Sequence, residues 1–285
     1  MRHLIYPVIF LLLNAQTALA QEQNCQTAGQ RVIALGGAVT EMIYALGEEK
    51  RLVGVDITST YPASALKLPK VGYYRTVSAE GLMSLGPDLI IADPDAGPPE
   101  VLDQLKAIGI CIRKIGGGGS ADAVLDRVAL IADILNAEGK GNTLRKSLSD
   151  DFAEATVRSM EIASEKPRVL FLLSAQDGTP VAAGIDTDAN AIIHLAGGVN
   201  AVDGFSGYKP LSSEVAAASK ADFILMMSHV VESSGGPSSI LNLPQIRLTP
   251  AGRLGNLISM DGLLLLGFGP RTPEAINSLS NQIYK

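Results

Sequence analysis

The strongest constraint on the fold is an alternation of short apolar runs and longer amphipathic runs. In the first half of the chain, strand-like runs occupy residues 31–35, 52–55, 89–92 and 111–115. Helix-like segments occupy residues 39–46, 78–85, 98–108 and 121–135. After Pro167 the alternation begins again, with strands expected at 168–173 and 223–227 and helices at 188–195 and 212–218. Such alternation is typical of an α/β fold with mostly parallel strands.

A long charged segment lies between the two alternating regions, from Gly141 to about Lys166. It places a stripe of apolar residues at helical spacing, namely Leu144, Leu148, Phe152, Ala155 and Met160. We therefore predict an N-terminal lobe over residues 21–139, a linking helix over 140–166 and a C-terminal lobe over 167–285.

The first twenty residues predict export. A basic start at Arg2 and His3 precedes an apolar run over residues 4–13 and a small-x-small cleavage signal that ends at Ala20. The apolar run is shorter than the roughly 20 residues that span a bilayer. We expect a signal peptide over residues 1–20 and no direct membrane insertion. Lipid attachment at Cys25 is the rival interpretation, but the preceding residues 22–24 are polar.

The net charge and the two cysteines limit which partners and which cysteine chemistry the chain can have. The formal charge of −6 disfavours a nucleic-acid or anionic-membrane partner. The two cysteines, Cys25 and Cys111, would enter an oxidising compartment, so a disulfide between them is expected, with two unpaired thiols as the alternative. The spacings of zinc and redox sites are absent from the sequence.

The most specific chemical motif is Gly72-Tyr73-Tyr74-Arg75, just before a predicted helix. A free phenol has a pKa of about 10, so a phenolate near neutral pH needs a neighbouring cation, which Arg75 provides. Phenolate is a hard anionic donor, and tyrosine is one of the axial ligands of haem iron. The motif predicts a ferric-iron ligand, with ordinary packing of both tyrosines as the alternative. If the segment is extended, Tyr74 points away from Tyr73.

Other motifs carry weaker signals. His229 follows an apolar strand, and ligands of open α/β sheets lie beyond the carboxyl ends of strands, although a polar loop residue is the simpler interpretation. His194 is interpreted as a surface or packed residue. The glycine run 116–119 lacks the ending of a phosphate-binding loop and predicts a turn. No Gly-x-Ser-x-Gly elbow or clustered His/Asp/Glu set supports a secreted enzyme or a metal-ion carrier.

Three blocks of sequence resemble the periplasmic haem-binding proteins of bacterial haem ABC importers. They are residues 71–81, 207–214 and 248–272. The resemblance covers essentially the whole mature chain and includes a wider cluster of cobalamin- and ferric-siderophore-binding proteins. It implies two Rossmann-like lobes joined by a single long helix, with a ligand cleft between the lobes. It also implies a monomeric periplasmic protein, not an enzyme, that carries ferric haem b.

The resemblance implies roles for individual residues. Tyr73 becomes the axial iron ligand and Arg75 its hydrogen-bonding partner, while Tyr74 occupies the variable position and could compete as the ligand. His229 could approach the open face of the iron. Arg253 matches a position whose guanidinium suits a haem propionate.

Glu80 and Glu214 match a pair that docks on arginines of the inner-membrane permease, which works with its ATPase. Each lies at or near a predicted helix start, one in each lobe, where helix capping and solvation are the alternative. A cobalamin or ferric-siderophore carrier would keep the fold and both glutamates. It would not need Tyr73 and Arg75, so these two residues separate the haem hypothesis from its alternatives.

Overall fold

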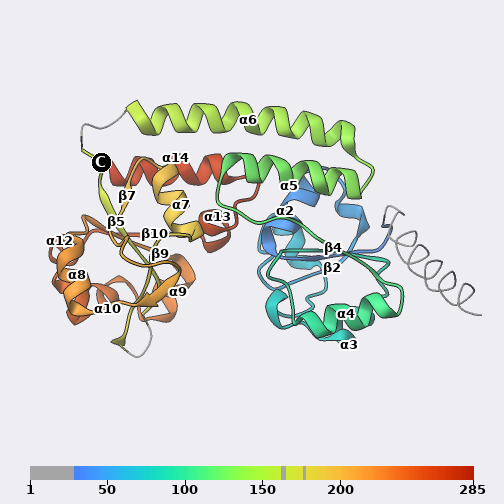
Figure 1. Ribbon diagram of the computed structural model, residues 1–285, viewed down its shortest axis with the longest axis horizontal. Helices are drawn as coiled ribbons and strands as arrows, with labels where there is room; N and C mark the ends of the chain where they lie inside the picture. The colour runs from blue at the N-terminus through green and yellow to red at the C-terminus, as the bar shows by residue number, and fades with distance from the viewer. Residues whose placement is uncertain (1–28, 162–164, 176–177) are drawn as a thin grey trace, which may run out of the picture. The chain divides into compact units, whose positions relative to one another are not determined.

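The computed structural model describes residues 29–161, 165–175 and 178–285. The chain forms two compact units (Figure 1). Of the described residues, unit 1 contains those up to Gly116 and Arg127–Asn142, and unit 2 contains those of Gly117–Asp126 and Thr143–Lys285. The α/β class and the two lobes predicted from the sequence are confirmed. The predicted signal peptide of residues 1–20 lies outside the described residues.

Unit 1 is built on a parallel sheet of four strands. In chain order they are β1 (Val32–Leu35), β2 (Leu52–Val55), β3 (Leu89–Ala92) and β4 (Cys111–Lys114). Their order in the sheet is β2-β1-β3-β4, and every pairing is parallel. All residues of β1 and β3 are buried, which explains why these strands are continuously apolar. Because the strands are parallel, their last residues meet at one edge, the carboxyl edge of unit 1.

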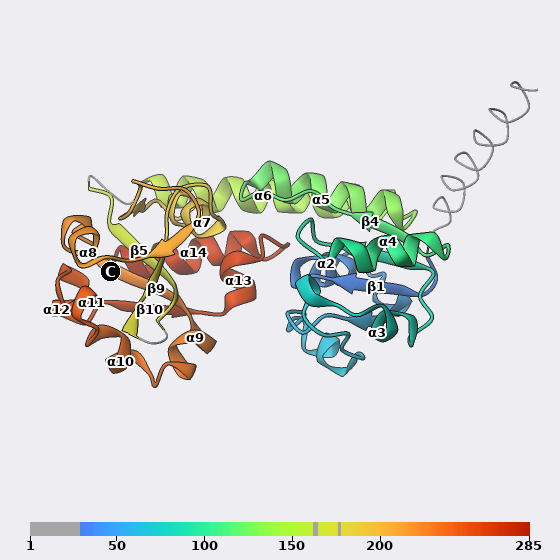
Figure 2. The same ribbon diagram turned by 60° about the horizontal axis from the view of Figure 1, so that its bottom comes forward.

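Helices connect the strands of unit 1. They are α2 (Gly37–Ala45), α3 (Ala79–Met83) and α4 (Pro99–Ala107), with 3₁₀ turns η1 (Glu49–Arg51), η2 (Ala63–Lys67) and η3 (Tyr74–Thr76). The helices α3 and α4 lie side by side (Figures 1 and 2). They contribute Leu82, Leu102 and Leu105 to a buried cluster with Ile33 and Ile90 of the sheet. This packing fixes the loop that leads into α3.

Unit 2 is built on a mixed sheet in the order β10-β9-β5-β6-β8. The strands β5 (Arg168–Ser174), β9 (Phe223–Met227) and β10 (Leu257–Met260) are parallel. The strands β6 (Val181–Ala183) and β8 (Tyr208–Pro210) form antiparallel pairings, and β7 (Val199–Asn200) pairs with β5. The antiparallel strands were not predicted, because β8 is short, lies at the surface and has no apolar pattern.

The connections of unit 2 are mostly short helices. They are α7 (Asp188–Leu195), α8 (Ser213–Ser219), α9 (Ser228–Ser233), α10 (Pro237–Leu241), α11 (Pro244–Arg247), α12 (Pro250–Leu254), α13 (Gly262–Leu266) and α14 (Thr272–Ile283). Proline stands in the first turn of α10, α11, α12 and α14, where its missing N–H costs nothing.

Two long helices, α5 (Ala121–Ile134) and α6 (Glu138–Glu161), contribute residues to both units. The helix α6 covers most of the predicted linking helix, and its residues Leu148 and Phe152 are buried. At Gly141 the two helices approach so closely that an added Cβ would collide with Ala132. Glycine is therefore required there. The predicted boundaries at residues 139 and 166 stay predictions.

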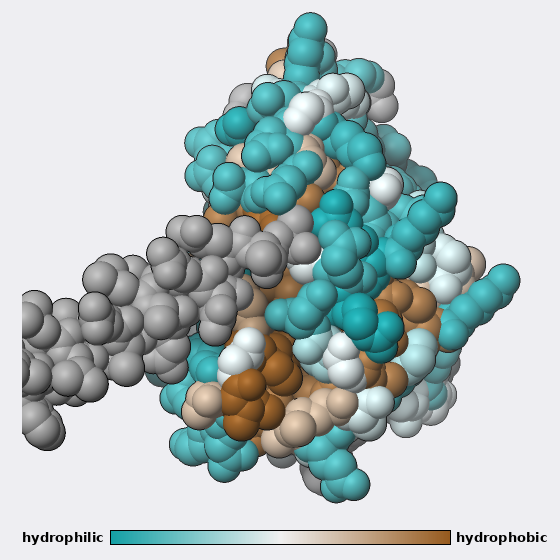
Figure 3. All heavy atoms as spheres, turned by 90° about the vertical axis from the view of Figure 1, so that its right-hand side faces the viewer, coloured by the Kyte–Doolittle hydropathy of each residue, from teal (hydrophilic) through white to brown (hydrophobic). Residues whose placement is uncertain are grey.

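A helix that crosses a membrane must be both long and apolar. None of the helices in 29–161, 165–175 and 178–285 has both the length and the hydropathy to cross a bilayer. The molecular face shown in Figure 3 is largely hydrophilic, with hydrophobic side chains gathered mainly in its lower part.

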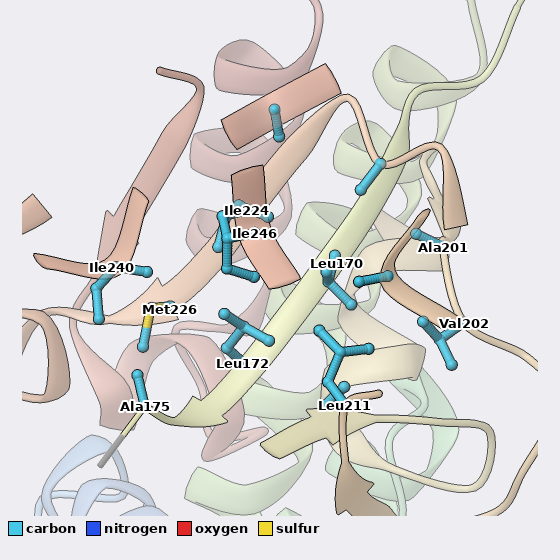
Figure 4. Close-up of a cluster of buried hydrophobic side chains, with 14 of the residues drawn as sticks. Leu170, Leu172, Ala175, Ala201, Val202, Leu211, Ile224, Met226, Ile240 and Ile246 are labelled. Atoms are coloured by element: carbon cyan, nitrogen blue, oxygen red, sulfur yellow. The ribbon is translucent and has the colours of Figure 1, made fainter. Parts of the chain in front are cut away.

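The core of unit 2 lies where β5 and β9 pair. Leu170 and Leu172 of β5 lie beside Ile224 and Met226 of β9, and Ile246 of α11 packs onto them (Figure 4). All five side chains are completely buried. This cluster holds the parallel strands in register and so fixes the positions of the loops that follow them.

We predict that Leu172→Ala lowers the free energy of unfolding by about 2 to 5 kcal/mol, because it removes buried methyl groups and leaves a cavity. Leu254→Ala is the matched control, since Leu254 is 73% exposed, and it should change stability by less than about 0.5 kcal/mol. Urea denaturation followed by circular dichroism measures both. Equal effects of the two substitutions would contradict this description of the core.

Candidate ligand-binding site

The segment that carries the two tyrosines lies at the carboxyl edge of unit 1. The Val71 N–H donates to the carbonyl of Val55, the last residue of β2, at 3.0 Å, and the Ile57 N–H donates to the Gly72 carbonyl at 2.9 Å. Gly72 has φ of 92°, a conformation that favours glycine. Tyr73 is extended, and η3 begins at the next residue. Gly72 thus turns the chain so that the tyrosines follow directly on the strand edge.

Tyr73 and Arg75 are brought together, as the spacing suggested. Nη1 of Arg75 donates to the Tyr73 hydroxyl at 3.2 Å, and Nη2 donates to Oδ2 of Asp95 at 2.8 Å. The Arg75 side chain is half exposed and Tyr73 is half-buried. The contact places a positively charged donor at the phenol oxygen. The role of Tyr73 as an iron ligand stays a prediction.

Tyr74 has a different environment from Tyr73. Its ring packs on the core of unit 1, 4.9 Å from the Tyr73 ring in an edge-on arrangement, and the Arg75 guanidinium carbon lies 5.0 Å from its centre. Burial raises the pKa of the Tyr74 hydroxyl well above 10, and the charge of Asp93 raises it further. Tyr74 is therefore a neutral phenol at neutral pH. The segment is extended only up to Tyr73, because η3 begins at Tyr74.

A loop that sequence reasoning missed completes this cluster. It follows β3 and carries Asp93 and Asp95, whose N–H donates to Oδ1 of Asp93 at 3.0 Å. The Gly97 N–H donates to the Tyr74 carbonyl, and the Gly97 carbonyl accepts from the Val77 N–H, both at 3.0 Å. Burial raises the pKa of Asp93. Two aspartates directly after a buried strand were the available signal, since such residues lie at the ligand-binding edge of a parallel sheet.

His229 lies at the carboxyl edge of unit 2. It is exposed in the first turn of α9, directly after β9. Its imidazole lies against Gly262, which follows β10, because an added Cβ there would come within 3.1 Å of His229 Cε1. His194 is exposed in the last turn of α7, which agrees with the surface interpretation. The position of His229 is compatible with a ligand contact, which stays a prediction.

Arg253 lies at the opposite edge of that sheet. It belongs to α12, which leads into the start of β10, and the Ala251 N–H of α12 donates to the carbonyl of Ala221, just before β9. Its Nη1 donates to the Leu248 carbonyl at 2.9 Å. The structure thus does not bring Arg253 and His229 together, and the contact of Arg253 with a haem propionate stays a prediction.

Glu80 and Glu214 occupy equivalent positions in the two units. Glu80 lies in the first turn of α3, where the Ser78 hydroxyl accepts from the N–H of Gly81 at 3.1 Å. Glu214 lies in the first turn of α8, where the Ser212 hydroxyl accepts from the N–H three residues later at 3.2 Å. Both glutamates are exposed. The serines already cap the helices, so the carboxylates remain available to a partner.

The remaining candidates for ligand-binding or covalent chemistry are clusters of metal-ligating side chains and the cysteines. Within the described ranges, no group of three or more His, Cys, Asp and Glu side chains could hold a metal ion. Cys111 is buried at the start of β4. Cys25 lies outside the described residues, so the disulfide between Cys25 and Cys111 stays a prediction. The site therefore offers a phenol oxygen and a guanidinium as its distinctive groups.

Known proteins are similar to this chain in sequence and in architecture. Residues 32–263 match the periplasmic binding protein family. A structure of the periplasmic haem-binding protein BhuT with two haems matches with a TM-score of 0.86 and 38% identity, over 89% of this chain and 97% of that chain.

Two curated relatives are more distant. The ABC transporter substrate-binding lipoprotein YvrC of Bacillus subtilis (strain 168) is 26% identical over 270 residues, or 93% of this chain and 83% of YvrC. The vitamin B12-binding protein of Vibrio cholerae serotype O1 (strain M66-2) is 28% identical over 205 residues, which are 71% of this chain and 72% of that protein.

The environment of Tyr74 gives a testable result. Because burial and Asp93 hold its phenol neutral, Tyr74→Phe should not change the phenolate absorbance of the unliganded protein up to about pH 11. The difference from wild type should appear only at higher pH. The neutral phenol favours the folded state, so its contribution to stability is present below pH 10 and is lost as the pH rises through the folded-state pKa. If Tyr74→Phe instead lacks a phenolate signal that wild type gains near pH 10, the described environment of Tyr74 is wrong.

Proposed function

Because the chain belongs to the periplasmic binding protein family, we propose that it captures ferric haem b and delivers it to an inner-membrane ABC permease and its ATPase. It is a substrate-binding protein and not an enzyme. The observation that carries the haem proposal is the hydrogen bond of 3.2 Å between Arg75 and the Tyr73 hydroxyl. It places a cationic donor at the oxygen that, once bound to ferric iron, would be the hard anionic donor that this metal prefers.

Tyr73 is the better iron ligand of the two tyrosines. Tyr74 packs into the core, and its raised pKa makes loss of its proton costly. Tyr73 is not part of that buried cluster, and its oxygen already accepts from a cation. Binding would then join two contributions. Burial of the apolar ring supplies about 25 cal/mol per Å² removed from water, and the iron–phenolate bond fixes its orientation.

The proposed place of action is the periplasm. The residues that support it are the signal-like segment 1–20, and the match to the periplasmic binding protein family agrees with it. We propose cleavage near Ala20 and a monomeric mature protein. The relative YvrC carries the name lipoprotein, so a mass measurement on the exported chain distinguishes cleavage near Ala20 from lipid attachment at Cys25.

A cobalamin carrier is the second candidate. The vitamin B12-binding protein of Vibrio cholerae favours it, since the relationship extends over 71% of this chain. Such a carrier would have no use for a phenolate next to Arg75. Competition between cyanocobalamin and haem for the purified protein therefore distinguishes the two candidates.

Titration of the mature protein with ferric haem tests the proposal. The Soret band of wild type should saturate near one equivalent with the charge-transfer band of a phenolate complex. Tyr73→Phe should weaken binding by at least about tenfold, because even residues behind a metal ligand have effects of that size. Tyr74→Phe is the matched control and should bind like wild type. A free-haem spectrum with wild type would refute haem capture, and loss of binding only in Tyr74→Phe would move the ligand to Tyr74.

We further propose that Glu80 and Glu214 dock on basic residues of the permease. Their matched positions and exposure support a contact at one point in each unit. A single exposed ion pair contributes little, typically below about 1 kcal/mol. Two points that are engaged together gain from their high effective concentration.

The double substitution Glu80→Ala/Glu214→Ala should leave haem affinity unchanged and abolish stimulation of the reconstituted ATPase by haem-loaded protein. Glu100→Ala is the matched control, because Glu100 is also exposed in the first turn of a helix, α4. It should stimulate the ATPase like wild type. Full stimulation by the double variant would rule out docking through these glutamates.

A further inference from the structure

We propose that Lys114 is a positioning residue for the ligand site, acting through Asp95 on the guanidinium of Arg75. This inference rests on the proposed function, since it concerns the site at which Tyr73 would bind iron. Neither the family match nor the motifs of the sequence assign a role to Lys114. A chain of three contacts runs from the end of β4 to the Tyr73 hydroxyl.

The first contact is between Lys114 and the loop after β3. Lys114 is the last residue of β4 and pairs in register with Ala92, the last residue of β3. Its Nζ donates to the Pro94 carbonyl at 2.9 Å and to the Ala96 carbonyl at 2.8 Å. These two carbonyls stand on either side of Asp95. One ammonium group, with its three donors, thus ties down both flanks of Asp95.

The second contact is between Asp95 and Arg75. Oδ2 of Asp95 accepts from Nη2 of Arg75 at 2.8 Å, while the backbone N–H of Asp95 donates to Asp93. The Asp95 side chain is 63% exposed, so it is the loop backbone that determines where its carboxylate stands. An ion pair this exposed adds little to stability. Its effect is therefore on the orientation of Arg75.

The third contact is between Arg75 and Tyr73. A guanidinium is planar and its donors have a fixed geometry, so holding Nη2 also fixes the direction of Nη1. Nη1 lies 3.2 Å from the Tyr73 hydroxyl, close to the limit of a useful hydrogen bond. A small rotation of the guanidinium would break this contact. The loop that Lys114 holds thus decides whether Arg75 faces the proposed iron ligand.

Removing the ammonium should loosen the loop without unfolding the protein. Lys114 itself is exposed at the strand end, and the two carbonyls would bond to water in its absence. Lys114→Met keeps the length of the side chain and removes its donors. Lys106→Met is the matched control, because Lys106 lies on the surface of α4 and pairs only across one helical turn with Asp103 at 3.0 Å.

The test compares haem affinity and the phenolate-to-iron charge-transfer band in wild type, Lys114→Met, Lys106→Met, Asp95→Ala and the double variant Lys114→Met/Asp95→Ala. We expect Lys114→Met to weaken binding about tenfold and to shift the band, in the range known for residues behind metal ligands. Lys106→Met should match wild type. In the Asp95→Ala background, Lys114→Met should have no further effect, because the two residues act in series.

A second measurement needs no ligand. Amide hydrogen exchange of the haem-free protein should be faster at Asp95 and Gly97 in Lys114→Met than in Lys106→Met, with equal thermal midpoints. The inference is overturned if exchange in the loop is unchanged, or if Lys114→Met costs the same affinity with and without Asp95. If wild type fails to bind haem, the proposed function fails instead, and the exchange data still decide whether Lys114 holds the loop.

Discussion

Parallel pairing of β1 to β4 is the constraint on which the site depends. It brings the loops that follow β1, β2 and β3, and the end of β4, to one edge of the sheet. Buried Asp56, directly after β2, joins two of these loops by accepting from the Gly36 N–H at 3.1 Å and from the Ser59 hydroxyl at 2.9 Å. A buried carboxyl group needs such hydrogen-bond partners. These bonds hold the loops at this edge in place in the unliganded protein.

At this edge, the neighbouring residues Tyr73 and Tyr74 have different surroundings. Tyr74 packs on the apolar cluster that α3 and α4 build, and its phenol stays neutral. Tyr73 lies outside that cluster and has the guanidinium of Arg75 at its oxygen. The change from an extended residue to a 3₁₀ turn between them produces this separation. A one-residue difference in backbone conformation thus selects the proposed iron ligand.

Several elements were predictable because their signal is local. The strand at 223–227 and the helix at 188–195 were predicted with the bounds that β9 and α7 have, since a continuous apolar run and a capped periodic run each specify one structure. Tyr73 and Arg75 were predictable as a pair, because two residues of separation suffice for their contact.

Other features depend on tertiary structure and could not be predicted. The exposed strand β8 has no apolar pattern. Asp95 and Lys114 are far from Arg75 in sequence. The register of β3 with β4 brings Lys114 to the loop of Asp95, and the backbone hydrogen bonds of Gly97 bring that loop to the segment of Arg75. The motif that contains Arg253 likewise does not reveal that α12 leads into the start of β10. Contacts between residues that are distant in sequence could therefore not be predicted from the sequence alone.

The central claim is that the oxygen of Tyr73 binds ferric iron while Arg75 stabilises its negative charge. Resonance Raman spectroscopy of the ferric haem complex tests it most directly, because excitation in the charge-transfer band enhances only the modes of a phenolate bound to iron. We expect phenolate modes in wild type and in Tyr74→Phe, and their loss in Tyr73→Phe. A wild-type complex without phenolate modes, or modes that persist in Tyr73→Phe, would contradict it.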